Sequence, residues 1–428
     1  MLRSVYTALL YVFAPIAWAG TALQGLRDPA YRDRLSERFG YTRVFASPSR
    51  PCLWIHAVSV GEVQAAAPLV RALLKKYPQH SLLITTATPT GAQRVRALFG
   101  DSVRHAYLPY DLPGAVRRFL SRVRPVLAIV MEREIWPNLF DECKRRGIPI
   151  LLASARISER SAIRHRKFAS LFRDALSGNV TVAAQTAQDA ERYRSIGAPR
   201  VLVAGNVKFD IEVPTAAREA GETLRAAQLA NRPVWVAGST HDGEEQQLLV
   251  AHRAVITQRP DALLVLVPRH PNRFEAVRAW LKNEQIEFAS RSRNESVTPA
   301  TSVLLVDTLG ELMMFYAAAD IAFVGGSLIA TVGGHNLLEP AVLERPILVG
   351  PHNFNAPDIA QLMIESGAAR EVHSAEQLAA AIQNLYADAT ARAEMGAKAK
   401  AIVAANRGAL SRVMELIEPL LQAPSQTT

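Results

Sequence analysis

The sequence has little cysteine and lacks the residue patterns that mark zinc or nucleic-acid sites. Its 428 residues include only two cysteines, Cys52 and Cys143, which are too few for a disulfide framework. This favours a protein of a reducing compartment. No paired Cys/His spacing, aromatic RNA-recognition motif or long Lys/Arg tract is present. The formal net charge of +10 therefore points to anionic lipid or to a phosphorylated substrate rather than to nucleic acid.

An apolar stretch from Val5 to Leu23 opens the chain. About 20 helical residues are needed to cross the hydrocarbon core, so the stretch is marginal as a span, and Pro15 would kink it. The flanking arginines are Arg3 before it and Arg27, Arg32, Arg34 and Arg38 after it. A cleaved signal peptide, a buried core helix and a membrane anchor all fit this pattern. The arginines on its C-terminal side favour an anchor over residues 1–25, with the basic flank on the anionic cytoplasmic face.

Short apolar runs alternate with amphipathic stretches along the rest of the chain. The expected strands are Leu53–Ala57, Leu82–Thr86, Val126–Met131, Ile148–Ala153, Val180–Ala184 and Val201–Ala204 and, after a charged break, Val234–Gly238, Leu263–Val267, Val303–Val306, Ile321–Val324 and Ile347–Val349. The expected helices include Gly61–Lys76, Pro137–Arg146 and a helical tail from Ser374 onward. Continuous apolar runs are typical of strands buried on both faces of a parallel sheet. The sequence thus predicts two α/β domains, over residues 26–210 and 233–428, with a linker over 211–232 and a cleft between the carboxyl ends of their strands.

Glycine-rich turns follow several of the predicted strands in the second half. They include Gly325-Gly326-Ser327, and the turn before Asn336, which opens a helix carrying Glu339. Such turns let the backbone approach a phosphate closely, and Glu339 could accept the hydroxyls of a ribose. Arg269 and His270 follow another strand and could neutralise a phosphate leaving group.

Each of these features also has an ordinary structural interpretation. Asn336-x-x-Glu339 and Thr308-x-x-Glu311 both fit helix capping boxes. Taken together, however, the turns and the basic pair favour a nucleotide site. The sequence contains no Asp-x-Asp, so we expect a site without metal or cofactor, in which arginine, histidine and backbone N–H groups stabilise the departing phosphate.

Candidate catalytic carboxylates lie in the first half. Glu62 stands where the first strand turns into the first helix, and Gly61 beside it would let an acceptor approach closely. Ser59-x-x-Glu62 is equally a capping box, which would satisfy two backbone donors and nothing more. Glu132 and Glu134 follow another strand and could bind an acceptor, tune a neighbouring base or form a surface ion-pair cluster.

Two basic residues, Arg156 and Lys208, follow two further strands of the first half. They could hold the carboxylate or phosphates of a substrate. Arginine and lysine at loop ends are usually only solvated, so neither residue is decisive alone.

Eight motifs, in order between His56 and Ala341, resemble those of the bacterial 3-deoxy-D-manno-oct-2-ulosonic acid (Kdo) transferases. They read HAVSVGE, EREIWPN, ARISERS, GNVKFD, AGSTHDGEE, PRHPNRF, DTLGEL and GGHNLLEPA. An ordered set of this kind is far more specific than any one glycine-rich loop. The resemblance implies a GT-B glycosyltransferase with two Rossmann-like domains and an N-terminal membrane anchor. Its expected role, at the cytoplasmic face of the inner membrane, is to move Kdo from CMP-Kdo onto the lipid A precursor lipid IVA in lipopolysaccharide biosynthesis.

The resemblance also implies roles for individual residues. It maps the catalytic base of an inverting, metal-independent transfer to Glu62. The donor-binding residues that it implies are Ser239, Thr240, Arg269, His270, Glu311, Gly326, Ser327, Asn336 and Glu339. Those expected to bind the acceptor or anionic groups are Ser59, Gly61, Glu132, Glu134, Arg156 and Lys208.

Three positions depart from the family pattern. Arg133 stands where a smaller polar residue is expected and could pair with either neighbouring glutamate; Leu337 replaces a proline, and Ser154 an asparagine. Two other functions stay open: a GT-B enzyme with a UDP-sugar donor, such as a lipid A disaccharide synthase, and a membrane-anchored regulatory protein that binds nucleotide without turnover. No residue decides how many Kdo residues are added.

Overall fold

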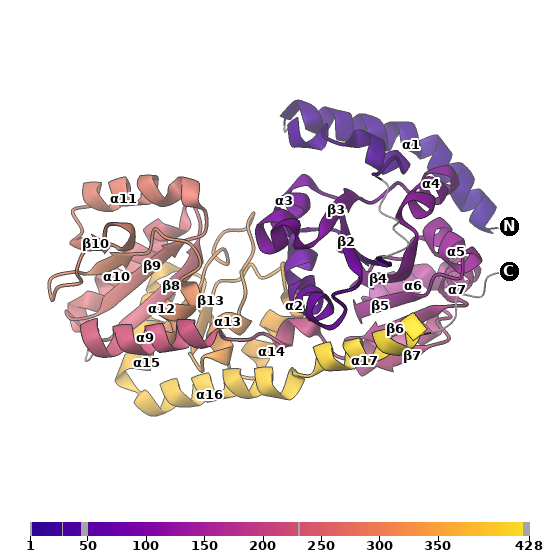
Figure 1. Cartoon of the computed structure of the whole chain (residues 1–428). Helices are drawn as coiled ribbons and strands as arrows, with labels where there is room; N and C mark the ends of the chain where they lie inside the picture. Colours follow the sequence, from indigo (N-terminus) through magenta and orange to yellow (C-terminus); the bar gives the residue numbers. More distant parts are fainter. Residues whose placement is uncertain (1, 28, 44–49, 230–231, 423–428) are drawn as a thin grey trace. The chain divides into compact units, whose positions relative to one another are not determined.

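A computed structural model describes residues 2–27, 29–43, 50–229 and 232–422, which form two compact units (Figure 1). Unit 1 comprises the described residues up to Asp210 and those from Asn406 onward, and unit 2 comprises those from Ile211 to Ala405. The chain therefore first leaves unit 1 after residue 210, where the predicted N-terminal domain ends.

The C-terminal helix belongs to unit 1, whereas the sequence had assigned the whole tail to the second domain. Helix α17 (Ala409–Gln422) is tied at its start by Asp210, whose carboxylate accepts hydrogen bonds from the N–H groups of Gly408 (2.6 Å) and Leu410 (2.7 Å). Its apolar side enters the core of unit 1 through Val413. The amphipathic pattern of the tail identified a helix but could not show which core it covers.

Unit 1 is built on a seven-stranded parallel sheet with the strand order β3-β2-β1-β4-β5-β6-β7. The strands are β1 (Cys52–His56), β2 (Ser81–Thr86), β3 (Arg104–Tyr107), β4 (Pro125–Met131), β5 (Ile150–Ala155), β6 (Val180–Ala184) and β7 (Val201–Val203). The chain order reverses between β1 and β4, which is the position where open α/β sheets bind ligands beyond the carboxyl ends of their strands.

Helices cover both faces of this sheet because successive side chains of each strand point to opposite sides. Leu53 and Ile55 of β1 pack with α2, α3 and α17, whereas Trp54 packs with α4, α5, α7 and α8. The helices are α2 (Val60–Lys76), α3 (Pro89–Phe99), α4 (Pro113–Val123), α5 (Pro137–Arg145), α6 (Glu159–Lys167), α7 (Ala169–Leu176) and α8 (Ala187–Ser195). Short 3-10 turns lie at η1 (Pro29–Tyr31), η2 (Leu35–Phe39), η3 (Gly100–Ser102) and η4 (Val207–Phe209).

The predicted anchor segment forms one long helix, α1 (Leu2–Arg27), which lies along unit 1 beside α5 and α7 (Figure 1). Its first turns are held by polar contacts: Tyr6 donates to Asp111 (3.0 Å) and Thr7 donates to Asn138 (3.0 Å). The helix exposes large apolar side chains, namely Leu2, Val5, Leu9, Tyr11, Val12, Phe13, Ile16, Leu23 and Leu26. None of the helices in the described ranges, α1 included, has the length and hydropathy that a membrane crossing requires. The expected membrane anchor is thus not confirmed.

Unit 2 repeats the architecture with a second seven-stranded parallel sheet, ordered β10-β11-β9-β8-β12-β13-β14. The strands are β8 (Val234–Thr240), β9 (Leu263–Pro268), β10 (Phe288–Ser290), β11 (Val303–Leu305), β12 (Ile321–Val324), β13 (Ile347–Val349) and β14 (Ala369–Glu371). The chain order reverses between β8 and β12, so the carboxyl ends of these two strands form the equivalent ligand position.

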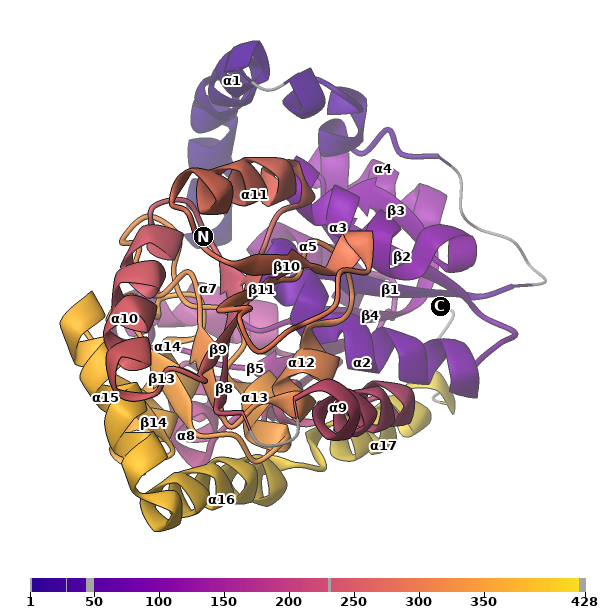
Figure 2. The ribbon, with the colours of Figure 1, turned by 90° about the vertical axis from the view of Figure 1, so that its left-hand side faces the viewer.

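The helices of unit 2 flank its sheet, and Figure 2 shows α10 and α15 side by side. They are α9 (Thr215–Gln228), α10 (Glu244–Gln258), α11 (Phe274–Asn283), α12 (Leu312–Ala318), α13 (Leu338–Val342), α14 (Pro357–Glu365), α15 (Ala375–Ala387) and α16 (Ala389–Asn406), with 3-10 turns η5 (Pro271–Arg273) and η6 (Arg291–Arg293). The predicted linker over 211–232 is mostly the helix α9, which packs against α12; residues 230 and 231 lie outside the described ranges.

Candidate functional site

The first cluster of candidate residues lies at the carboxyl ends of β1 and β4 in unit 1. Glu62 stands in the first turn of α2, immediately after β1, and its carboxylate accepts a hydrogen bond from the N–H of Val58 (2.8 Å). Ser59 is the N-cap residue, but its side chain makes no capping hydrogen bond. The capping box is therefore incomplete: only the glutamate turns back, and it reaches one residue further than that motif requires.

The environment of Glu62 makes it a stronger base than an ordinary carboxylate. Burial raises the pKa of Glu62 to about 7, and the nearby carboxylates Glu132 and Glu134 act in the same direction. The Val58 N–H and the Arg133 cation oppose this shift. A carboxylate that titrates near neutral pH is suited to general-base catalysis, since it is both ionised and basic at that pH.

Glu132 is buried and held by two cations. It is 3% exposed and forms ion pairs with Arg156 (2.8 Å) and Lys208 (2.8 Å). Burial alone would raise the pKa of Glu132, but Lys208 and Arg156 outweigh burial and lower it. Glu132 is therefore a permanent negative charge, and the two predicted anion-binding residues hold it in place. Their role in binding a substrate stays a prediction.

The two departures in this region have identifiable contacts. Arg133 is exposed, and its charge opposes the burial that raises the pKa of Glu134. Ser154, in the left-handed region at φ 49°, accepts a hydrogen bond from the N–H of Val207 (3.1 Å), next to Lys208. The serine thus helps to place the lysine that binds Glu132.

The second cluster lies at the carboxyl ends of β8, β9 and β12 in unit 2, where Glu244 joins two loops. Glu244 begins α10 and is 0% exposed. Its carboxylate accepts hydrogen bonds from the N–H groups of Gly326 (2.8 Å), Leu328 (3.1 Å) and His241 (3.2 Å). It thereby fixes the glycine-rich turn after β12 against the turn after β8. Burial raises the pKa of Glu244 to about 7, although the three N–H donors act in the opposite direction.

Three histidines and an arginine gather beside these turns. The rings of His241 and His335 stack with centroids 5.0 Å apart and their Nε2 atoms 2.7 Å apart, and His270 meets His241 edge-on at 5.1 Å. Burial lowers the pKa of His241 to about 4, and the nearby cationic groups His270 and Arg269 lower it further. Burial likewise lowers the pKa of His335 to about 3. Because these shifts come partly from mutual repulsion of positive charge, an anion bound here would be stabilised by the same groups.

Several predicted donor-binding side chains are used to build the turns. Thr240 is 0% exposed, and its hydroxyl donates to Glu245 (3.0 Å). Ser327 is also 0% exposed; its hydroxyl donates to the carbonyl of Val324 (2.6 Å) and accepts from the N–H of Gly350 (2.8 Å). Such buried hydroxyls shape the loop, so any contact with a ligand would come from its backbone.

Gly326 and Ser239 have backbone conformations that the site requires. Gly326 has φ 77°, and a Cβ atom there would meet the carbonyl oxygen of Gly333 at 2.6 Å, so only glycine fits. Ser239 has φ 60°, unusual for a residue with a side chain. Arg269 follows β9, and its N–H donates to the carbonyl of Thr240 (3.0 Å), which places it at the same edge.

The remaining predicted donor residues lie in local hydrogen-bond pairs. The side-chain N–H of Asn336 donates to Glu339 (3.2 Å), and its oxygen accepts from the N–H of Leu338 (3.1 Å). Leu337, which replaces the expected proline, is the N-cap residue of α13 and is 2% exposed. Glu311 pairs with Arg291 (2.8 Å), whose side-chain hydrogen bond lowers the pKa of Glu311.

The sequence analysis missed several residues that hold this cluster together. Glu244 is one; Glu245 is another, 1% exposed and paired with Arg273 (2.5 Å), which also binds Asp242 (2.9 Å). Two adjacent glutamates in the first turn of a helix are ordinary N-terminal residues, so nothing in the pattern showed that both are buried. His241 and His335 were visible as histidines in glycine-rich turns, but only the fold brings them together.

An apolar pocket lies in unit 1 between α1 and α4. It encloses about 530 Å³ and is lined by Tyr11, Pro15, Phe39, Leu112 and Arg118, among others. Arg118 donates to the carbonyl of Phe39 (2.9 Å), so its positive charge is held in place by a neutral acceptor. The pocket could accept a hydrocarbon chain.

No group of three or more His, Cys, Asp or Glu side chains is placed to hold a metal ion anywhere in the described ranges. The arginine of the second cluster is cationic and its histidines carry ring N–H donors, which suit an anion.

Comparisons with known proteins agree with one another. Residues 33–211 match the family described as 3-deoxy-D-manno-octulosonic-acid transferase (kdotransferase). A 3-deoxy-D-manno-octulosonic acid transferase of Haemophilus influenzae is 42% identical over 99% of this chain and 99% of its own length. A protein of the same name from Bordetella pertussis is 39% identical over 98% of this chain and 99% of its own. The crystal structure of a glycosyltransferase from Rickettsia africae, 14% identical, covers 89% of this chain and 100% of its own with a TM-score of 0.53, which supports the GT-B-like fold alone.

Proposed function

The chain belongs to the family of 3-deoxy-D-manno-octulosonic acid (Kdo) transferases and is a Kdo transferase, and we propose that it transfers Kdo from CMP-Kdo to lipid IVA with inversion at the anomeric carbon. The proposed mechanism rests on the position and the raised pKa of Glu62. This partly buried carboxylate, whose pKa is raised to about 7, stands at the switch point of the unit 1 sheet, next to a glycine.

In the proposed step, Glu62 removes the proton of an acceptor hydroxyl as that oxygen attacks the anomeric carbon of Kdo. The bond between that carbon and the phosphate oxygen of CMP breaks, and CMP leaves with the electron pair. Glu132 supports the base indirectly, because its permanent negative charge helps to keep the pKa of Glu62 high. The first turn of α2 has space for an acceptor because Gly61 has only Ser59 Oγ (3.9 Å) near the position of a Cβ atom.

The donor phosphate would be bound by the second cluster. Arg269, His270 and the N–H groups of the turn at Gly326 provide positive charge and hydrogen-bond donors for a leaving phosphate, without need of a metal. Glu244 would act as a positioning residue, since it holds Gly326 and His241 in one arrangement.

Unit 1 would bind the lipid acceptor and contact the membrane. We place the enzyme at the cytoplasmic face of the inner membrane, with the exposed apolar side of α1 in the interfacial layer. The apolar pocket between α1 and α4, with Arg118 at its edge, could take an acyl chain of a phosphorylated lipid.

The transfer reaction itself is the test of donor, acceptor and base. CMP-Kdo and a tetra-acylated lipid A precursor are supplied to wild type and to Glu62→Gln, and product mass is measured. We expect wild-type product and at least a 100-fold lower rate for the variant, as for loss of a general base. The mass gives the number of Kdo residues added. If a folded variant that still binds CMP turns over at the wild-type rate, Glu62 is not the base.

Donor competition separates this function from a UDP-sugar transferase. CMP should inhibit the reaction and UDP should not. If UDP competes as strongly as CMP, the assignment of the donor is wrong.

Flotation with anionic lipid vesicles tests the membrane proposal. Phe13→Ser and Ile16→Ser, on the exposed side of α1, should reduce the vesicle-bound fraction, whereas Val250→Ser, an exposed apolar residue of α10, should not. If Phe13→Ser and Ile16→Ser bind the vesicles as well as wild type and Val250→Ser do, α1 is not the membrane contact.

A further inference from the structure

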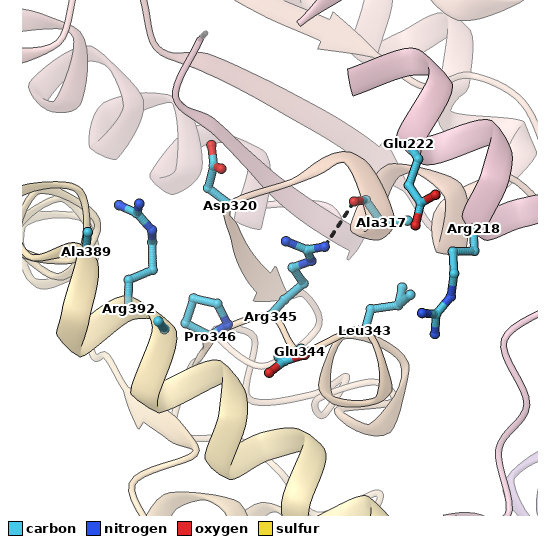
Figure 3. Close-up of a pocket in the computed structure, with 11 residues that line it drawn as sticks. Arg218, Glu222, Ala317, Asp320, Leu343, Glu344, Arg345, Pro346, Ala389 and Arg392 are labelled. Atoms are coloured by element: carbon cyan, nitrogen blue, oxygen red, sulfur yellow. Dashed lines mark hydrogen bonds between the residues drawn. The ribbon is translucent and has the colours of Figure 1, made fainter. Parts of the chain in front are cut away.

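A basic pocket lies in unit 2 at the edge opposite the second cluster. It encloses about 360 Å³ and is lined at the amino ends of two strands by Asp320, which precedes β12, and by Arg345 and Pro346, which precede β13 (Figure 3). The glycine-rich turns of the candidate donor site follow the carboxyl ends of the same sheet. The two sites are therefore separated by the length of the strands, and the basic pocket is not an extension of the donor site.

Three arginines from three separate elements surround this pocket. Figure 3 shows Arg218 on α9, Arg345 on the segment before β13 and Arg392 on α16. Three carboxylates also line it, but two of them are neutralised from outside the lining. Asp320 is bound by Arg225 (3.1 Å) and Glu344 by Lys400 (2.7 Å).

The remaining carboxylate, Glu222, cannot offset the three arginines. Including Arg225 and Lys400, five cations face three carboxylates, which leaves a net charge of +2 around the pocket. Guanidinium groups that lack carboxylate partners are the usual means by which proteins hold phosphate.

Arg345 has hydrogen-bonding capacity that the protein does not use. One of its terminal N–H groups donates to the carbonyl of Ala317 (3.2 Å), but its buried Nε has no hydrogen-bond partner. A buried donor without an acceptor is destabilising, so a ligand that supplied one would be favoured. Burial lowers the pKa of Arg345 overall; Asp320 and Glu344 oppose this shift, whereas Arg225 and Arg218 add to it, and an anion in the pocket would act in the same direction as the two carboxylates.

We propose that this pocket, at Arg218, Arg345 and Arg392, is a second anion site that binds the phosphate group of a small solute. A tetrahedral oxyanion has enough acceptor oxygens for guanidinium groups from three directions. The pocket is larger than one phosphate ion, so a phosphomonoester with a small organic part also fits the chemistry. This inference does not depend on the proposed transfer reaction.

Occupation of the site has a structural consequence within unit 2. Arg218 lies on α9, the first helix after the chain enters unit 2, and Arg392 lies on α16, the last helix before the chain leaves it. A shared anion would connect both helices to the segment that carries Arg345. Exchange of backbone amides in α9 and α16 should therefore slow when the site is filled.

The test uses the full-length protein, with CMP in excess throughout so that any CMP site is already filled. Inorganic phosphate is titrated, and binding is measured by calorimetry and by hydrogen exchange. We expect saturable binding, protection of Thr215–Gln228 and Ala389–Asn406, and at least tenfold weaker binding in Arg345→Gln and Arg392→Gln. Arg253→Gln serves as the matched control because Arg253 pairs with Glu284 on the surface, away from the pocket.

Folding and the source of the phosphate are controlled separately. Arg218 is exposed, so Arg218→Gln should fold even if Arg345→Gln does not, and it should weaken binding at least threefold. Phosphatidate vesicles are compared with inorganic phosphate; competition between them would identify a lipid headgroup as one source, and its absence would leave a soluble phosphate. Non-saturable binding, or equal binding by the arginine variants and Arg253→Gln, overturns the proposal.

Discussion

Replacing Glu62 with glutamine should make the protein inactive and, at alkaline pH, more stable. The folded-state pKa of Glu62 is about 7, against 4.5 for an unperturbed glutamate. The folded state therefore binds the proton more tightly than the unfolded state. Its free energy of unfolding falls as pH rises from about 4.5 to about 7, and the loss is complete above that range.

The size of this effect follows from the pKa difference. Each pKa unit corresponds to about 1.4 kcal/mol, so a shift from 4.5 to about 7 gives about 3.5 kcal/mol at most. Because Glu62 is only partly buried, solvent screening reduces this to ~1–2 kcal/mol. Glutamine carries no charge at any pH, and its side-chain oxygen can still accept the hydrogen bond from Val58. The variant should therefore exceed wild type in stability by ~1–2 kcal/mol at pH 8 and match it at pH 4.5.

Urea unfolding at the two pH values measures this difference, and the transfer assay measures activity on the same samples. Glu191→Gln, an exposed carboxylate of α8, controls for the substitution itself. In wild type, the transfer rate should fall about tenfold for each pH unit below 7, because the protonated carboxylate cannot act as a base. A residue that only caps α2 predicts the reverse: the variant would lose stability at pH 8 and keep its activity. That result would refute the reasoning.

Other substitutions and treatments have equally definite expected outcomes. Glu132→Gln leaves Arg156 and Lys208 without their counter-ion, so urea unfolding should show a loss of about 3 kcal/mol. In Glu244→Ala three backbone N–H groups lose their acceptor, and CMP affinity measured by calorimetry should fall about tenfold, equivalent to about 1.4 kcal/mol. Excess EDTA should leave the initial transfer rate unchanged, because arginine and histidine supply the positive charge at the proposed donor site; restoration of a lost rate by Mg²⁺ would contradict this.

The inner strands of both sheets and the edge strand β7 could be predicted from the sequence, whereas the other three edge strands could not. Continuous apolar runs identified β1, β4, β8 and β12, each buried on both faces. The missed strands β3, β10 and β14 lie at sheet edges. Strand β3 begins with the exposed Arg104 and β14 contains the exposed Arg370, since an edge strand needs less apolar surface. Their pattern is therefore not distinguishable from that of a loop.

The linker and the tail were misjudged for a related reason. The charged, alanine-rich stretch of α9 was assigned to the linker, but it forms a helix with only Gly221 buried. That glycine lets α9 approach Met314 and Ala317 of α12 closely. The periodicity of α17 predicted a helix correctly. The local pattern could not show that α17 packs on the core of unit 1. That packing depends on hydrogen bonds to Asp210, almost 200 residues earlier in the chain.

The capping-box motif at Glu62 does not by itself determine what this carboxylate does. A capping box specifies only that a carboxylate stands three residues after a serine, and that description applies equally to a cap and to a base. The surroundings of Glu62 distinguish a base from a cap, and part of those surroundings comes from residues about 70 positions away. Glu132 and Glu134 come near Glu62 only through the pairing of β1 with β4. Burial is the largest cause of the raised pKa of Glu62, and the negative charge of Glu132, which Lys208 and Arg156 maintain, raises it further. The two basic residues that the sequence suggested for substrate binding, Arg156 and Lys208, thus have contacts within the protein: they keep Glu132 charged beside the carboxylate that we propose as the base.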